Sequence, residues 1–112
     1  MPKNNYRVLW SEIAINDLEE IVTYIARDSP ANALKVHGKL KDKADLLETY
    51  PLRGRIVPEL ARLGMRAWRE IISKPYRIIY RLDKNIVYVP AVLDSRRDLD
   101  DLLLNRMVRI KP

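Results

Sequence analysis

Arginines are the side chains of this sequence best suited to chemistry. Those between positions 66 and 97 are Arg66, Arg69, Arg77, Arg81, Arg96 and Arg97, in a stretch that is otherwise rich in isoleucine, valine and tyrosine. A guanidinium group combines a permanent charge with a planar fork of donors, so several of them converging on one surface would bind phosphate or carboxylate. The alternative for each arginine is an ordinary place on a solvent-facing sheet surface.

Arg77 is the stronger candidate of the two central arginines. Strand side chains alternate, so Arg77 and Arg81 share one face of the segment YRIIYRLD and the other face is apolar. Arg81 lies close to the DKN sequence at 83–85, which predicts a turn, and charged side chains near turns are usually solvated. We therefore expect Arg77, more than Arg81, to contact an anion.

Composition excludes several classes of site. The 112 residues include no cysteine and one histidine, His37, and there is no glycine-rich phosphate loop. Disulfide scaffolds, thiol nucleophiles and cysteine-ligated zinc are thus excluded, and we expect neither a metal nor a cofactor. The net charge of +6 and a pI near 9.7 indicate an anionic partner: a nucleic acid, a ribosome or an acidic protein segment.

The first half of the chain predicts a strand followed by two helices. Residues 6–10 favour a strand that ends where Ser11 can cap a helix, and Ser29 with Pro30 predicts the start of a second helix. Each helix carries an apolar stripe, and the members of the two stripes are Ala14, Leu18, Ile21, Val22 and Ile25, then Ala33, Val36, Leu40, Ala44 and Leu47. We interpret the pair as an αα-hairpin that covers a sheet.

The second half predicts an antiparallel meander. A connector at 51–60, PLRGRIVPEL, precedes three strand-like segments between 66 and 93, and Pro90 marks the last as an edge strand or a bulge. The segment DSRRDLDDLLL at 94–104 predicts a short terminal helix. We predict one domain over residues 1–112, of class α+β: a small antiparallel β-sheet packed by the N-terminal αα-hairpin, in the order β-α-α-β-β-β with a short C-terminal helix.

These features together resemble the RelE/ParE superfamily of toxins from type II toxin–antitoxin systems. The resemblance spans nearly the whole chain and rests on the element order and on DLEEIVTYIARDSP, GRIVPEL, YRIIYR and SRRDL. It implies one of two activities on a shared scaffold. RelE-type members are ribosome-dependent mRNA endonucleases, and ParE-type members poison DNA gyrase.

The resemblance also implies candidate residues. Arg77 matches a RelE-type arginine that handles the scissile phosphate, Arg96 or Arg97 lies near a second family arginine, and Glu59 matches a glutamate of YoeB-like members. Proton transfer needs further groups, and here the strand RAWREII has no lysine and the terminal segment neither tyrosine nor histidine. Glu59 could instead cap a helix or pair with an arginine, and Arg77 could tie the sheet to Glu59 or Glu70.

On this resemblance we favour the ParE-like, plasmid-stabilisation branch, an inhibitor of DNA gyrase rather than an enzyme. The expected target-binding residues are Arg69, Arg77, Arg96 and Arg97, with the C-terminal segment. The expected partner is a cognate antitoxin with an acidic, partly disordered segment, in a toxin–antitoxin hetero-oligomer. The alternatives are a RelE- or YoeB-like mRNA endonuclease using Glu59, Arg77, Arg96 and Arg97 on the ribosome, and a non-toxic basic nucleic-acid-binding module.

No apolar run is long enough for a membrane span, so we expect a cytoplasmic protein.

Overall fold

The computed structural model describes residues 6–96, which begin with a strand and a helical hairpin. The bounds are β1 (Arg7–Trp10), α1 (Glu12–Ala26), α2 (Pro30–Asp45) and a short 3-10 turn, η1 (Leu46–Glu48). The Ser11 hydroxyl accepts from the Ala14 amide at 3.0 Å, and the Ser29 hydroxyl accepts from the Asn32 amide at 3.1 Å. Both predicted caps are confirmed, because each serine satisfies an amide of the first helical turn that has no partner within the helix.

The connector is more structured than its sequence indicates. It contains the short strand β2 (Arg55–Ile56) and the one-turn helix α3 (Pro58–Ala61), neither of which is part of the predicted element order. The meander follows as β3 (Trp68–Ser73), β4 (Tyr76–Asp83) and β5 (Ile86–Asp94). One of its two turns falls at the predicted DKN sequence, and the other lies at Lys74 and Pro75.

The α+β class is confirmed, but the sheet is mixed rather than purely antiparallel. Its five strands lie in the order β1-β5-β4-β3-β2, and β1 runs parallel to β5 while the other neighbours are antiparallel. No tight turn joins β1 to its neighbour, since the helical hairpin and the meander lie between them in the chain. Such a long connection permits the parallel direction.

Pro90 lies in a central strand, and the bulge predicted as one of its two explanations is present. The β4–β5 register passes from Ile79 opposite Ala91 to Arg81 opposite Tyr88, so Val89 and Pro90 together face one residue of β4. The Ser11 amide donates to the Val89 carbonyl at 3.0 Å, which ends the β1 ladder where α1 begins. The β1 ladder therefore ends beside the bulge of β5.

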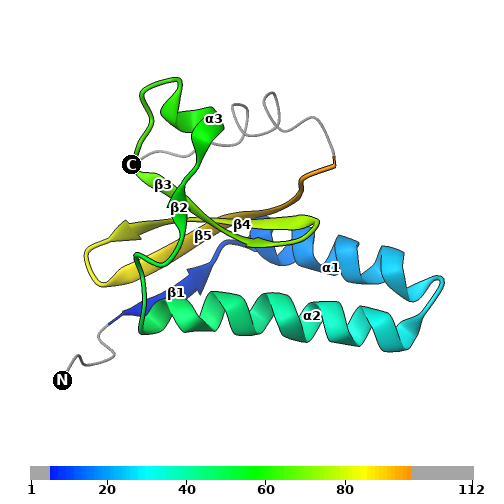
Figure 1. Ribbon diagram of the computed structural model, residues 1–112. Helices are drawn as coiled ribbons and strands as arrows, with labels where there is room; N and C mark the ends of the chain where they lie inside the picture. The colour runs from blue at the N-terminus through cyan, green and yellow to red at the C-terminus, as the bar shows by residue number, and fades with distance from the viewer. Residues whose placement is uncertain (1–5, 97–112) are drawn as a thin grey trace.

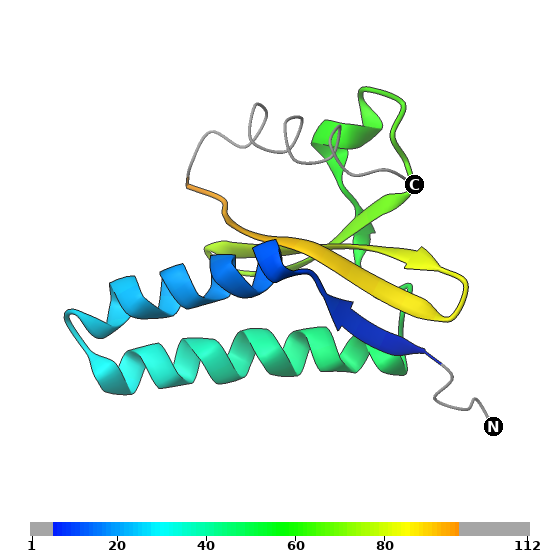
Figure 2. The ribbon, with the colours of Figure 1, turned by 180° about the vertical axis from the view of Figure 1, so that it is seen from behind.

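The two faces of the sheet are covered differently (Figures 1 and 2). The helical hairpin lies on one face, and its buried core residues are Ala14, Leu18, Leu40, Ala44, Leu47, Ile71, Tyr76, Ile78, Tyr80, Val87, Val89 and Val92. A second, smaller cluster lies on the other face under α3 and consists of Val57, Leu60, Trp68, Ile79, Ala91 and Leu93. The second face is therefore partly a core surface and not simply a solvated one.

Two further expectations from the sequence concern a membrane span and the C-terminal segment. Within residues 6–96, no helix has the length and apolar character needed to cross a bilayer. Of the terminal helix predicted at 94–104, Asp94 instead ends β5, and Ser95 and Arg96 form a turn; the rest of that segment, with Arg97 and the C-terminal residues, lies outside the described residues.

Leu18 tests the predicted helical stripe, because its side chain is 6% exposed between α1 and the sheet. Leu18→Asp should destabilise the protein by about 4 kcal/mol or more, since it removes apolar burial and buries a charge. The matched control is Leu34→Asp on α2, whose leucine is 73% exposed. Thermal melts should show loss of folding or a fall of more than about 15 °C for Leu18→Asp and almost no change for Leu34→Asp. Equal melting temperatures for the two variants would contradict this packing.

Candidate functional site

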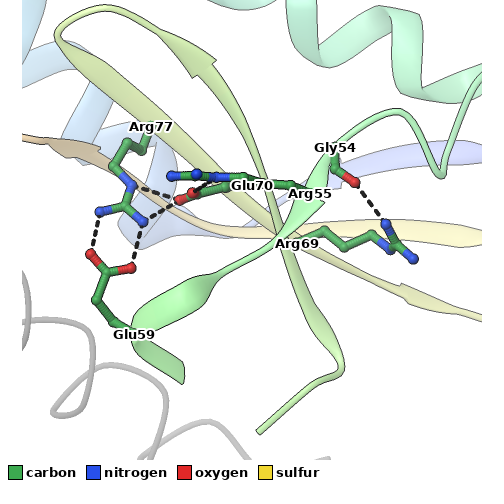
Figure 3. A network of polar contacts seen from close by, with 6 residues as sticks. All are labelled: Gly54, Arg55, Glu59, Arg69, Glu70 and Arg77. Atoms are coloured by element: carbon green, nitrogen blue, oxygen red, sulfur yellow. Dashed lines mark hydrogen bonds and ion pairs between the residues drawn. The ribbon is translucent and has the colours of Figure 1, made fainter. Parts of the chain in front are cut away.

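The guanidinium of Arg77 is surrounded by two carboxylates on the second face of the sheet (Figure 3). Arg77 is 5% exposed on β4. Its two terminal nitrogens, Nη1 and Nη2, donate to the two oxygens of Glu59 at 2.7 and 2.8 Å, and its Nε donates to Oε1 of Glu70 at 2.6 Å. The hydrogen bonds to Glu59, together with the charge of Glu70, raise the pKa of Arg77 above its ordinary value. The strongest predicted anion-binding residue is thus already paired within the chain.

Glu70 connects two arginines from strands on either side of its own. Its side chain is fully buried on β3, and its second oxygen accepts from the Nε of Arg55 at 2.7 Å. Arg55 lies opposite Glu70 in the β2–β3 ladder, and 59% of its side chain is exposed. A buried carboxylate is costly unless charged donors compensate it, and here Arg55 and Arg77 donate to the two oxygens of Glu70.

Glu59 lies in the first turn of α3, where it faces Arg77. Its hydrogen bonds with Arg77 lower its pKa from 4.5 to about 2, against the opposing effect of burial. A carboxylate with so low a pKa has little tendency to take a proton near neutral pH. The geometry therefore favours Glu59 as a partner of Arg77 over Glu59 as a general base.

The loop before β2 is fixed beside this network by Tyr80 and Gly54. The Tyr80 hydroxyl donates to the Pro51 carbonyl at 2.7 Å and accepts from the Gly54 amide at 3.0 Å, and burial raises the pKa of Tyr80. A Cβ on Gly54 would lie 2.5 Å from the Glu70 carbonyl oxygen. Arg69 completes the arrangement by donating from Nη1 to the Gly54 carbonyl at 2.7 Å.

The predicted site residues do not all converge. Arg77 and Glu59 meet, whereas Arg69 is half-buried and points away from Arg77 toward Gly54 (Figure 3). Arg96 is exposed and pairs with Asp94 at 2.6 Å, and Arg97 lies outside the described residues. Pairing of Arg77 with Glu59 or Glu70 was one of the alternatives from the sequence, and both pairs are present; what was not predicted is the buried position of Glu70 between Arg77 and Arg55. The signal that could have found it is its spacing of two from Trp68, which places its carboxylate on a buried strand face.

The fold, a helical hairpin packed on one face of a five-stranded mixed sheet, is shared with a known class of small proteins. A solved structure of a chromosomal ParDE TA system from P. aeruginosa shares the fold with a TM-score of 0.64, covering 82% of this chain and 98% of that one at 17% sequence identity. At that identity the similarity concerns the fold alone, which is the fold of RelE/ParE-type toxins.

The family follows from the sequence comparison. The family model described as ParE toxin of type II toxin-antitoxin system, parDE, matches residues 8–99, and the chain belongs to this family. The chain is 31% identical to Toxin RelE2 of Caulobacter vibrioides over 91 residues, which is 81% of this chain and 97% of that protein. It is also 32% identical to the putative toxin Y4kP of Sinorhizobium fredii over 82 residues, or 71% and 79% of the two chains. The resemblance found in the sequence is confirmed.

Gly54 should be intolerant of any side chain. Gly54→Ala would bring a methyl group against the Glu70 backbone and the Tyr80 hydroxyl, so we expect a loss of about 1–3 kcal/mol in the free energy of unfolding. Gly38→Ala is the matched control, because it lies within α2 with nothing within 4 Å of the added atom and should stabilise the helix by up to about 1 kcal/mol. Urea titrations of both variants measure the difference. Two shifts of the same sign would contradict the close approach.

Glu59 should make part of the stability depend on pH. Its pKa of about 2 in the folded protein lies below its ordinary 4.5, so the ionised carboxylate stabilises the fold above about pH 4.5, and this contribution is lost as the pH falls toward 2. The contribution is at most about 3 kcal/mol. Glu59→Gln should therefore be less stable than the parent at pH 7, and the gap should narrow below about pH 4. Glu20→Gln, at an exposed position of α1, is the control in denaturant titrations. A gap that stays constant down to pH 2.5 would contradict the pairing.

Proposed function

We propose that this toxin acts by inhibiting DNA gyrase in the cytoplasm and is neutralised by a cognate antitoxin. The observation that carries the choice of target is the paired state of Arg77. In the nuclease mechanism implied by the RelE-like resemblance, the corresponding arginine handles the scissile phosphate. Here its three nitrogens donate to Glu59 and Glu70, so a phosphate would first have to displace a bidentate carboxylate.

The proton-transfer groups for RNA cleavage are also poorly matched. Transesterification needs a base for the 2′-hydroxyl and an acid for the leaving oxygen. The strand beside Arg77 reads WREIIS and has no lysine, and the low pKa of Glu59 makes it a weak base. Both features support an inhibitor that binds its target over an enzyme that cuts RNA.

The accessible arginines are the better candidates for direct contact with gyrase. Arg96 has 66% of its side chain exposed and Arg69 is half-buried, so a partner could contact both, sharing Arg96 with the exposed Asp94 pair and Arg69 with the Gly54 carbonyl. Arg97 and the C-terminal segment stay in this proposal as further contacts. Arg77, which is buried, would contribute indirectly by holding α3 on the sheet through Glu59.

A ribosome-dependent mRNA endonuclease is the second candidate, and a specific observation favours it. Glu59 and Arg77 are adjacent, as the YoeB-like pattern requires, and one relative carries the name RelE2. In that case Glu59 would release Arg77 when mRNA enters on the ribosome, and Arg96 with Arg97 would hold neighbouring phosphates.

The antitoxin we propose contains a flexible, acidic and apolar segment that folds on the toxin. The net charge of +6 complements such a segment. Exposed apolar side chains on the helical layer, such as Tyr24 and Leu34, offer surface to bury. The ordering cost of the segment would be offset by this burial and by charge pairing.

Expression and two parallel assays test the proposal. The chain should arrest growth when produced alone, and co-expression of the antitoxin encoded beside it should restore growth; a non-toxic nucleic-acid-binding module would do neither. Purified toxin should inhibit supercoiling by gyrase and leave mRNA intact on programmed ribosomes. Arg96→Ala should weaken gyrase inhibition without loss of folding. Efficient mRNA cleavage that disappears in Arg77→Lys, with gyrase unaffected by the parent, would replace the gyrase target with the ribosome.

A further inference from the structure

Arg81 lies in a row of large side chains that crosses the second face of the sheet. In the strand register, Leu9 on β1 is opposite Tyr88 on β5, Tyr88 is opposite Arg81 on β4, and Arg81 is opposite Trp68 on β3. Trp68 is buried, Arg81 and Tyr88 are half-buried, and Leu9 is 49% exposed. The row therefore rises from the core cluster under α3 to an open edge of the sheet.

The guanidinium of Arg81 has no anionic partner among residues 6–96. Its Nε is buried and makes no hydrogen bond, and its central carbon lies 5.1 Å from the centroid of the Trp68 ring. The ring holds the cation by a cation–π contact, which leaves the buried Nε–H donor unsatisfied. A partly desolvated charge without a counter-charge is costly, so this arginine is placed to receive an anion from outside.

The surroundings of Arg81 are positively charged. Arg7 on the edge strand, Lys84 in the β4–β5 turn and Arg66 just before β3 are all exposed. One carboxylate, Asp83, lies two residues from Arg81 on the same strand face. Within residues 6–96, these cations outnumber the neighbouring carboxylate of Asp83 on this part of the second face, whereas the Arg77 end has Glu59 and Glu70 to balance its charge.

We propose that this surface, formed by Arg81, Tyr88, Arg7, Lys84 and Arg66, binds the phosphate backbone of DNA. The cations are spread over strands about 5 Å apart. Duplex DNA presents about one negative charge per 1.7 Å of axis, so it can meet all of them at once. An acidic protein side chain would satisfy Arg81 alone. Tyr88 adds an amphipathic ring beside the guanidinium, of the kind on which an unpaired base can stack.

This inference deepens the proposed function, on which it rests for its biological setting, because gyrase works on bound DNA. A toxin that contacts both the enzyme and its DNA through different surfaces would bind their complex more tightly than either alone. Arg96 and Arg69 would face the protein, and the Arg81 surface would face the DNA.

The test measures binding of a fluorescent DNA duplex of about 20 base pairs to the full chain, by anisotropy, between about 50 and 200 mM salt. Arg81→Met removes the charge but keeps an apolar chain over Trp68. It should weaken binding at least fivefold, lower the salt slope by about 1, and melt at or above the parent temperature. Arg27→Met is the matched control, since Arg27 also lies over a ring, that of Tyr24 at 5.9 Å, but on the helical layer. It should bind DNA like the parent.

A second variant, Arg7→Gln, and a second binding partner, the antitoxin, make the outcome decisive. Arg7→Gln, at the exposed edge, should also weaken DNA binding and reduce the salt slope without touching the Trp68 contact. Parent-like DNA binding by both Arg81→Met and Arg7→Gln would overturn the inference. So would a loss of antitoxin binding in Arg81→Met with DNA binding intact, which would assign the surface to an acidic protein. If DNA binding depends on Arg81, the DNA-binding surface is supported even when the parent does not inhibit gyrase. The DNA-binding proposal and the gyrase proposal can therefore be rejected independently.

Discussion

The second face of the sheet depends on one buried carboxylate. The side chain of Glu70 is fully buried, and Arg55 and Arg77 donate to its two oxygens from the two neighbouring strands. This pairing attaches the two-residue strand β2 to the meander, and Arg77 in turn holds α3 through Glu59. Loss of Arg77 would remove the buried partner of Glu70, which costs more than a surface ion pair contributes. Local charge neutrality thus determines how the connector folds over the sheet.

Local sequence patterns predicted the parts of the fold that local physics decides. The caps at Ser11 and Ser29, the two apolar helical stripes and the meander turns all depend on residues within a few positions of one another. The strand β2 has two residues and no periodicity, so it exists only because β3 offers a ladder and Glu70 offers a charge. The direction of β1 is likewise decided by β5, nearly 80 residues away, and no local pattern carries that information.

The candidate site was predictable in residue type, whereas the pairing of Arg77 with glutamate was only one of several alternatives. Alternation along YRIIYRLD correctly placed Arg77 and Arg81 on one face. Nearness to a turn then favoured Arg77 as the free cation, since turn residues tend to be solvated. Both glutamates that neutralise Arg77 come from other segments, whereas Arg81 is stacked on Trp68 from the neighbouring strand. Counter-charge is a property of tertiary contacts, and a sequence shows the charges without showing which of them meet.

The difference between these two arginines also bears on how one scaffold can serve different targets. An anion that binds Arg77 must displace a bidentate carboxylate held at 2.7 and 2.8 Å in a site largely closed to water. An anion that binds Arg81 displaces nothing and relieves an unsatisfied donor. If a guanidinium–anion contact is equally strong at both arginines, an external phosphate binds Arg81. The Glu59 carboxylate then remains on Arg77. A relative in which the Glu59 position lacks a carboxylate would reverse that preference, because Arg77 would then be the cation left to find an external phosphate.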